Sequence, residues 1–433
     1  MATYSKTKKV KPWQHLLRAL RYRNFRLFFS GQLISLIGTW MQHVALSWLI
    51  YRLTGSAFML GMVAFIGQFP IFFLTPIAGV YADRHNRHRL LLLTQSLAMG
   101  LAFILAALVL TDQIRIWHIF AISFMAGLIF AFDIPVRHAF IADMVERKED
   151  LGNAIALNSS LFNAARLLGP SLAGILIATV GEGICFLVNA CSYLTIIVAL
   201  LAMRIKTSGA RRPQKVMLQE IRDGWQYALK FTSIKMILIL LALMSLWGIS
   251  FQVLMPVFAR DIFLGGPRTL GYLYSLAGAG ALTGAVFLAG RQNAYGLEKI
   301  IAGTSHLFAL ALIFFALSPA LWFSLVMSFA AGFGMMVQMA SSNTVLQTVV
   351  DEDKRGRIMS LYAAAFMGTM PIGSLLAGFL ASRIGAPATL LLGGGCCLLL
   401  AAVFTRRLPA LQTEIQPIFT QKGIRIHTPA KVE

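Results

Sequence analysis

The chain has 433 residues, of which 58% are hydrophobic and only 13% are charged, and its mean hydropathy is +0.72. Soluble proteins average about 25% charged residues, so this composition excludes a soluble globular protein and predicts a membrane protein. The net charge of +21 comes from 38 basic and 17 acidic residues. Taken alone, this charge suggests nucleic-acid binding, and the placement of the basic residues decides against that interpretation.

Twelve apolar stretches are long enough to cross a hydrocarbon core of roughly 30 Å, which takes about 20 helical residues each. The first six are expected at 25–50, 57–82, 90–110, 116–141, 152–179 and 183–203. The second six are expected at 234–262, 269–290, 297–318, 320–345, 356–384 and 387–405. The sequence therefore predicts an all-α membrane protein with twelve transmembrane helices.

The predicted spans form two halves, 25–203 and 234–405, joined by a central polar segment at 204–233. A basic segment at 1–24 precedes them and a tail at 406–433 follows them. None of the three polar segments is long enough for a domain of its own, so no soluble domain is expected.

The two halves resemble each other in sequence. Residues 152–174 recur 204 positions later as 356–378. A weaker echo joins 35–42 to 245–252 at an offset of 210 and continues to Leu60 and Gly61, which match Leu270 and Gly271. A parallel duplication of six spans, giving pseudo-symmetric halves, is a transporter architecture with the substrate site between the halves.

All but six of the 38 basic residues fall on one side of the predicted membrane. The exceptions are Arg166 inside a span and, in the opposite connections, Arg52, Arg115, Arg260, Arg268 and Arg383. The positive-inside rule then predicts that both termini are cytoplasmic. The basic residues are expected to orient the chain and to contact anionic membrane lipids, and no nucleic-acid partner is expected.

Motifs of built-in chemistry are absent from the sequence. It contains no G-x-x-x-x-G-K-[ST] phosphate loop, no H-E-x-x-H helix and no G-x-S-x-G elbow. The four cysteines fall inside predicted spans without the spacing or histidine partners of a metal site. We therefore expect neither an enzyme nor a bound metal or cofactor, and transport must use an ion gradient or the gradient of the solute.

One motif, GVYADRHNRHR at 79–89, lies where the second span reaches the cytoplasm. It resembles the loop signature of the major facilitator superfamily, G-x-x-x-D-R-x-G-R-R/K, and the resemblance covers all twelve spans. Asn86 stands where the family has its second glycine. Asparagine tolerates the left-handed backbone that such a turn can require, so the departure is mild.

The resemblance implies a gating latch made of Gly79, Asp83, Arg84, Arg87 and Arg89. The eleventh span begins near Gly356 on the same side, and the positive end of a helix, worth roughly half a charge, would attract Asp83 when the halves close inside. Two interpretations stay open: the motif latches the outward-facing state, or it only fixes topology. The matching loop at 290–296 lacks the acid, so asymmetric gating is expected.

Three further segments carry a more specific resemblance. They are NFRLFFSGQLISLIGTW at 24–40, FDIPVRHAFIADMV at 132–145 and AIALNSSLFNAARLLGP at 154–170. They are similar to the bacterial branch of the superfamily that contains the enterobactin exporter and, more distantly, macrolide efflux proteins. This resemblance implies export across a bacterial cytoplasmic (inner) membrane.

A helix-packing motif lies in the fifth span, at Gly169, Pro170 and Gly174. Its spacing is similar to the G-P-x-x-G-G signature of exporters in the superfamily, although it is one residue wider. Proline between glycines weakens backbone hydrogen bonding and permits close packing, which a rocking helix can use. Plain helix packing, as in an importer, is the alternative.

Two residues are candidates for coupling to protons, Asp133 and His43. Asp133 is an acid inside the fourth span, and Arg137, one turn further on, is its easiest partner. Either the two form a structural pair at the inner mouth or Asp133 exchanges a proton as the cavity opens to each side. His43 titrates near pH 6.5 when unperturbed, but a lone histidine in a helix is more often a hydrogen-bonded packing residue.

The candidate substrate cavity is drawn from polar residues inside the spans: Gln42, Asn158, Phe162, Arg166, Gln252, Gln338, Asn343 and Tyr362. A lone arginine at a helix centre costs about 2.5 to 3.5 kcal/mol on insertion scales, so Arg166 must face a cavity or a partner. The repeat pairs Gln42 with Gln252, so their amides are expected to face each other. Methionines nearby in the second half suit irregular aromatic ligands, or are simple packing.

These observations predict a secondary active exporter that moves a bulky amphiphilic small molecule, siderophore-like or a hydrophobic drug, by alternating access with proton antiport. A monomer is expected, and an outer-membrane partner is left unidentified. A lipid or lysolipid flippase is the alternative within transport. A receptor that has kept the transporter fold without transporting is the alternative outside it.

Overall fold

The computed structural model describes residues 17–204, 226–291 and 294–422, apart from the side chains of Asp83 and Lys148. Of the predicted cytoplasmic segments, 1–16, 205–225 and 423–433 lie outside this description. The described residues form helices and connections without a strand, and twelve helical spans are long and apolar enough to cross a membrane. The prediction of an all-α protein with twelve spans is confirmed.

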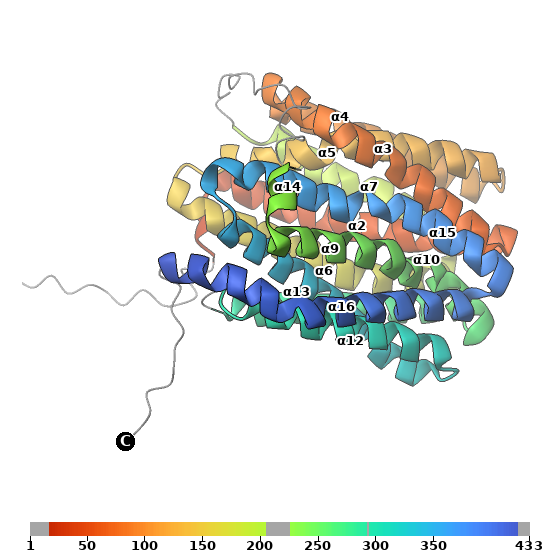
Figure 1. Cartoon of the computed structure of the whole chain (residues 1–433). Coiled ribbons are helices and arrows are strands. Elements are labelled where there is room, and N and C mark those ends of the chain that lie inside the picture. The colour runs from red at the N-terminus through yellow and green to blue at the C-terminus, as the bar shows by residue number, and fades with distance from the viewer. Residues whose placement is uncertain (1–16, 205–225, 292–293, 423–433) are drawn as a thin grey trace, which may run out of the picture.

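The spans run roughly parallel to one another along one long direction of the molecule (Figure 1). A short helix, η1 (Arg18–Arg21), precedes the first half. The first half contains α2 (Arg23–Thr54), α3 (Ala57–Arg84), α4 (Arg87–Leu110), α5 (Ile116–Asp143), α6 (Lys148–Val180) and α7 (Glu182–Leu201).

The second half contains α9 (Thr232–Gly248), α10 (Ser250–Val257), η2 (Phe258–Ile262), α11 (Pro267–Ala289), α12 (Leu297–Leu317), α13 (Leu321–Val349), α14 (Glu352–Met367), α15 (Thr369–Ile384) and α16 (Ala386–Gln421). The seventh span is thus built from α9, α10 and η2, and the eleventh from α14 and α15. Residues 406–421, expected in the tail, continue the helix of the last span.

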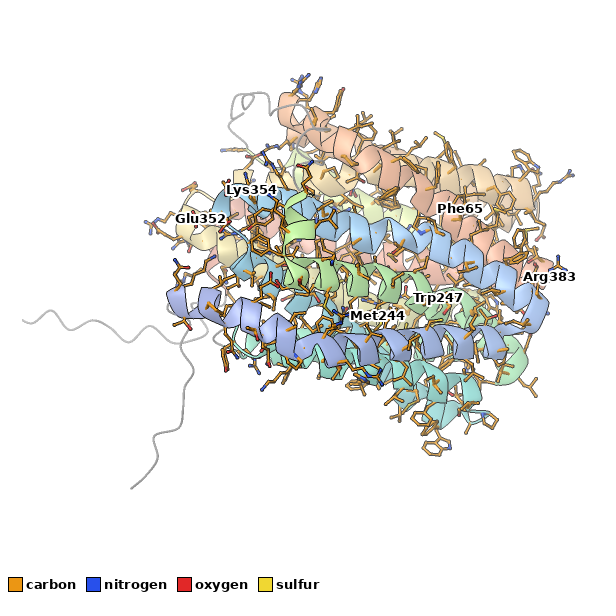
Figure 2. The ribbon with its side chains drawn as sticks, viewed as in Figure 1. Phe65, Met244, Trp247, Glu352, Lys354 and Arg383 are labelled. Carbon is orange, nitrogen blue, oxygen red and sulfur yellow. The ribbon has the colours of Figure 1, made fainter. Side chains whose placement is uncertain are left out.

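Two ends of the molecule differ in their connections. One end, the short-loop end, carries the connections at 55–56, 111–115, 181, 263–266, 318–320 and 385. The opposite end, the basic end, carries the motif at 79–89 and the start of α14. In Figure 2 Arg383 lies at the short-loop end, and Glu352 and Lys354 lie at the basic end.

The halves meet through two glycine crossings near the short-loop end. A Cβ atom built on Gly61 of α3 would lie 2.9 Å from the Cα of Gly378 of α15, and one on Gly174 of α6 would lie 3.1 Å from the Cα of Gly271 of α11. Residues without side chains therefore let the backbones of the two halves touch. The repeat exchanges the crossings, because its offsets of 210 and 204 relate Gly61 to Gly271 and Gly174 to Gly378.

The helix at the start of the eleventh span is less buried than the helix in the middle of the seventh. Only Ile358 of the sixteen residues of α14 is buried, whereas seven of the eight residues of α10 are buried. The glycine crossings between the halves lie near the short-loop end. Direct backbone contact between the halves at these glycines is therefore found away from the basic end.

The seventh and eleventh spans are both interrupted, at Ile249 and Gly368, while their first-half counterparts α2 and α6 are continuous. The interruptions lie beside each other, because the hydroxyl of Ser245 donates to the carbonyl of Phe366 at 2.8 Å. This bond satisfies a carbonyl near the end of α14, where no helix partner is available. Discontinuous spans are common where membrane transporters bind or move.

Replacing Gly174 with leucine is expected to force the halves apart, because the new side chain would overlap the backbone of Gly271. Overpacking costs typically about 1 to 3 kcal/mol, so Gly174→Leu should lower the melting temperature of the purified protein. Gly100→Leu is the control, since a Cβ atom there meets nothing within 4 Å. Equal melting temperatures for the two variants would contradict the close crossing.

Candidate functional site

A cavity of about 10 Å³, which has room for roughly one water molecule, lies between the halves near the middle of the spans. Its walls come from α2, α6, α10 and α11, and they are formed by Trp40, Arg166, Pro170, Gln252, Met255, Tyr274 and Ala277. The hydroxyl of Tyr274 donates to the carbonyl of Gln252 at 2.7 Å, which joins two helices of the second half at this point. The structure thus brings the predicted residues Arg166 and Gln252 into one cavity wall.

Arg166 faces aromatic groups at this cavity. Its guanidinium carbon lies 5.7 Å from the centroid of the Trp40 ring. The Trp40 ring meets Phe162 edge to face at a centroid distance of 5.7 Å, and His43 at 6.0 Å. The cavity candidates Phe162 and Arg166 of α6 therefore both lie against Trp40 of α2.

Other predicted cavity residues are used elsewhere. Gln42 accepts a hydrogen bond from Asn189 of α7 at 2.7 Å, so its amide is held by its own half instead of facing Gln252. Gln338 is only 3% exposed and lies inside the second half. The hydroxyl of Tyr362 donates to the carbonyl of Met339 at 3.0 Å, so it ties α14 to α13.

Asn343 and Asn158 lie nearer to open space. Asn343 of α13 is partly exposed and accepts a hydrogen bond from Gln347 one turn further on. Asn158 of α6 is also partly exposed, one turn before the exposed Phe162. These two residues belong to the part of the spans that leads to the basic end.

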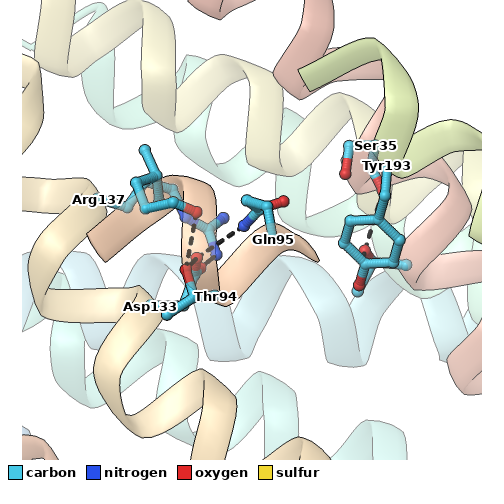
Figure 3. Close-up of polar contacts among 8 residues, drawn as sticks. Ser35, Thr94, Gln95, Asp133, Arg137 and Tyr193 are labelled. Atoms are coloured by element: carbon cyan, nitrogen blue, oxygen red, sulfur yellow. Dashed lines mark hydrogen bonds and ion pairs between the residues drawn. The ribbon is translucent and has the colours of Figure 1, made fainter. Parts of the chain in front are cut away.

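Asp133 is enclosed in the first half (Figure 3). Its side chain is 1% exposed and accepts hydrogen bonds from Thr94 at 2.9 Å and Gln95 at 2.6 Å, and it forms an ion pair with Arg137. The partner proposed from the sequence spacing is therefore the one found. The pair lies between α4 and α5 and is not among the residues that line the small cavity.

The second half repeats this cluster without its charges. The segment FMAGLIF at 124–130 matches FAAGFGM at 329–335, which places Gln338 and Ser342 at the positions of Asp133 and Arg137. In the same way Thr304 and Ser305 replace Thr94 and Gln95. The polar character of the site is kept in both halves, but among the described residues of the two clusters only Asp133 and Arg137 form an ion pair.

His43 is placed differently from Asp133. More than a third of its side chain is exposed, and its ring adjoins Trp40, which lines the cavity. The hydrogen-bonded packing role considered for it is not seen among the described residues. His43 thus lies beside the cavity wall, whereas Asp133 is enclosed within the first half.

The motif at 79–89 lies at the basic end. Arg87 forms an ion pair with Asp143 at 3.3 Å between α4 and α5, while Arg84 and Arg89 are exposed and Gly79 lies within α3. The side chain of Asp83 is outside the described set. At the start of α14, the hydroxyl of the half-buried Tyr227 donates to the carboxylate of Asp351 at 2.9 Å. Burial and this bond raise the pKa of Tyr227 to about 12, which keeps it a donor.

Asn86 differs from its expected role. Its φ of −68° is not left-handed, and its side chain caps α4 by accepting from the Arg89 amide at 3.1 Å. An asparagine oxygen satisfies a free amide at a helix start, which glycine cannot do. The substitution of the family's glycine therefore serves capping in place of backbone freedom.

A clamp that the sequence analysis missed joins the halves at the short-loop end. The hydroxyl of Tyr51 donates to the carboxylate of Asp261, and Arg260 donates to the carbonyl of Tyr51 at 3.2 Å. We call Tyr51, Arg260 and Asp261 the interdomain clamp. Tyr51 and Asp261 are repeat equivalents, 210 positions apart, and under a two-fold repeat a residue meets its equivalent only near the axis. Their separation of 210 positions, which equals the offset of the repeat, was the feature of the sequence that could have predicted this contact.

The packing motif of the fifth span serves two contacts. A Cβ atom on Gly169 would lie 2.5 Å from the Cβ of Trp40, so this glycine packs α6 against α2 within the first half. Gly174 makes the crossing to α11 described above, and Pro170 lines the cavity between them. Within the described residues, no group of three His, Cys, Asp or Glu side chains could hold a metal ion.

The family described as transmembrane secretion effector matches residues 15–423. The chain belongs to this family of the major facilitator superfamily. Its members are transporters, and the twelve spans make the protein a multi-pass protein of the bacterial inner membrane.

Three characterised relatives are similar along almost the whole chain. The staphyloferrin A transporter of Staphylococcus aureus is 26% identical over 84% of this chain and 91% of that protein. The multidrug efflux pump Tap of Mycolicibacterium fortuitum is 26% identical over 86% of this chain and 93% of that protein. Macrolide efflux protein A of Streptococcus pyogenes is 22% identical over 88% of this chain and 96% of that protein.

Solved structures share the fold at low identity. A bacterial homolog of the human lysosomal transporter Spinster, in an inward-facing and unoccupied conformation, has a TM-score of 0.64 at 14% identity and covers 95% of this chain and 98% of its own. A POT family transporter in complex with 5-aminolevulinic acid has a TM-score of 0.74 at 11% identity, with coverages of 90% and 96%. These likenesses identify the fold.

Asp133→Asn alone is expected to destabilise the first half, because it leaves Arg137 buried without a counter-charge. Removing one partner of a buried pair costs about 3 to 5 kcal/mol, whereas replacing both with apolar residues is often neutral. The double variant Asp133→Leu with Arg137→Met should therefore melt close to wild type, and the single variant well below it. A single variant as stable as Asp112→Asn, a change in an exposed loop, would contradict this.

Tyr51→Phe is expected to weaken the interdomain clamp and to favour opening at the short-loop end. A hydrogen bond contributes a net of about 0.5 to 1.5 kcal/mol, which corresponds to a roughly 2- to 10-fold shift. The distance between spin labels on the exposed Leu53 and Leu264 should show a larger open population. Tyr272→Phe, at an exposed tyrosine of α11, is the control. Identical distance distributions for Tyr51→Phe and wild type would show that the interdomain clamp does not stabilise the closed short-loop end.

Proposed function

We propose that this protein is a secondary active exporter that works by alternating access of its two halves. The observation that carries the proposal is the combination of close contact between the halves at the short-loop end, an exposed α14 at the basic end and a cavity of mixed polarity between the halves. A rigid-body rocking about the glycine crossings would exchange the closed end for the open one. The conformation described above is then one of two end states.

The orientation follows from charge. Of the described basic residues outside Arg166, only Arg52, Arg115, Arg260, Arg268 and Arg383 lie at the short-loop end. Positive residues are retained on the cytoplasmic side, so the basic end and both termini face the cytoplasm. The conformation is accordingly inward-facing, ready to accept a substrate from the cytoplasm. The basic surface would contact anionic lipids of the inner leaflet.

The substrate is a bulky amphiphilic small molecule. Relatives with near-complete coverage are named for transport of staphyloferrin A and for efflux of macrolides or several drugs. In this chain the cavity combines a cation with tryptophan, methionine and tyrosine side chains, which suits a ligand with polar and apolar parts. Support for the siderophore-like or drug-like class rests on these two facts together.

Proton antiport supplies the energy in this proposal. His43 adjoins Trp40 of the cavity wall, and an imidazole ring can both accept and donate a proton. Asp133 would need its enclosure by Thr94 and Gln95 to loosen before it could do so. The double variant Asp133→Leu with Arg137→Met distinguishes the two proton-coupling candidates. If this variant still exports substrate in a proton-dependent way, His43 is the carrier.

The latch at 79–89 would engage only when the basic end closes. In the inward-facing conformation α14 stands open to its surroundings, and Arg87 is paired with Asp143 within its own half. On closure, the N-terminus of α14 would approach Asp83, and its positive end would attract the carboxylate. The latch would therefore stabilise the outward-facing state.

The test is transport in inverted membrane vesicles with an imposed proton gradient, using a catecholate siderophore, a macrolide and a fluorescent dye as the panel. We expect gradient-dependent uptake of at least one compound that collapses with a protonophore. Asp83→Asn should insert normally and lose most of its turnover, because the outward-facing state loses its latch. Asp112→Asn is the matched control in an exposed loop.

Two results would contradict the proposal. Absence of gradient-dependent uptake for every compound would remove export by antiport. Normal turnover by a well-expressed Asp83→Asn variant would remove the latch and leave the motif with a role in topology only.

A further inference from the structure

We propose that the exported substrate carries a negative charge that Arg166 binds, and that cationic compounds of the same shape are excluded. This inference rests on the proposed export function and selects between the two substrate classes that function leaves open. It follows from the distribution of charge around the cavity.

Arg166 is a cation without a counter-charge. It lies near the middle of α6, and no carboxylate of the described residues forms an ion pair or hydrogen bond with it. Its recorded contact is the face of the Trp40 ring, with 5.7 Å between the guanidinium carbon and the ring centroid. The attraction of an aromatic face for a cation is weaker than the cost of placing an arginine in the middle of a membrane, so this contact does not offset that cost.

The buried acids of the described chain are already engaged elsewhere. They are Asp133, Asp150, Glu182 and Glu298, whose respective partners are Arg137, Arg21, Arg52 and Gln412. Asp261 is held in the interdomain clamp by Tyr51. None of these carboxylates is left to neutralise Arg166, so the cavity keeps a positive potential for its ligand.

The duplication does not balance this charge. The position of Arg166 in the second half is occupied by Met370, 204 residues later. The facing wall from the second half is neutral, formed by Gln252, Met255 and Tyr274. One cation therefore faces an uncharged wall, which favours one anionic group on the ligand and repels a cationic one.

The surroundings of Arg166 indicate where the rest of the ligand lies. Trp40 and Phe162 form an edge-to-face pair beside the guanidinium, and 47% of the Phe162 side chain is exposed. An aromatic acid could place its oxygens on the guanidinium, whose planar fork binds carboxylates bidentately, and its ring against these side chains. The chemical class is thus an aromatic or amphiphilic anion.

The experiment measures binding to the full-length protein in nanodiscs of phosphatidylcholine, without a gradient. The probes are fluorescein, which is anionic at pH 7.5, and rhodamine 123, a cation with the same xanthene core, and binding is followed by fluorescence polarisation. We expect saturable binding of fluorescein and none of rhodamine 123. Arg166→Gln should weaken fluorescein binding by about 10-fold or more, since hydrogen bonds to charged groups are the stronger kind.

Two further variants separate charge recognition from structural damage. Arg166→Lys keeps the charge and should retain part of the affinity. Arg383→Gln removes an arginine that also lies 5.7 Å from an aromatic centroid, that of Phe379, but at the short-loop end, and it should bind as wild type. Each variant is compared by melting temperature and monodispersity.

The inference would be overturned if wild type failed to bind fluorescein, if rhodamine 123 bound as tightly, or if Arg166→Gln bound fluorescein as wild type does. These outcomes are independent of the transport test. If Arg166 binds the anion but no compound is transported in vesicles, the export proposal is contradicted and the inference about anion binding is not. Gradient-driven transport of rhodamine 123 would count against the charge selectivity and leave export standing.

Discussion

Direct backbone contact between the halves at the two glycine crossings is the constraint on which the rest of the arrangement depends. A side chain larger than hydrogen at Gly61, Gly174, Gly271 or Gly378 would meet backbone atoms of the opposite half. These contacts lie near one end of long helices, so they hold the halves together at that end. The interdomain clamp lies at the same end, and the cavity lies between the halves further along the spans.

The duplication gives symmetry of shape without symmetry of charge. Repeat-related residues make the same contacts at the crossings, and the polar cluster around Asp133 has its counterpart around Gln338. The charged residues Asp133, Arg137 and Arg166 of the described spans nevertheless belong to the first half, and their repeat positions in the second half are the uncharged Gln338, Ser342 and Met370. The second half contributes instead the two interrupted spans joined by Ser245 and Phe366. The halves thus differ in the charges of their spans and in the continuity of their helices.

Placement of polar residues around each helix was the part of the site that sequence reasoning predicted least well. Arg166 and Gln252 were expected at the cavity and are found there, while Gln42 turns to α7 and Gln338 lies inside its own half. In a membrane, lipid and bundle interior are both apolar, so the hydrophobic pattern does not reveal which face of a helix points inward. The rotation of each helix is decided by packing.

The sequence by itself determined the number of spans, their order, the duplication and the expected side of the basic residues. Each of these depends on the cost of burying charge or bare backbone in hydrocarbon, which acts locally on every segment. Only the tertiary structure decided that Asp133 is paired and enclosed, that Arg166 has no counter-charge, and that Tyr51 meets Asp261. Those facts depend on which helices become neighbours, and neighbours are chosen by close packing between segments that lie far apart in the chain.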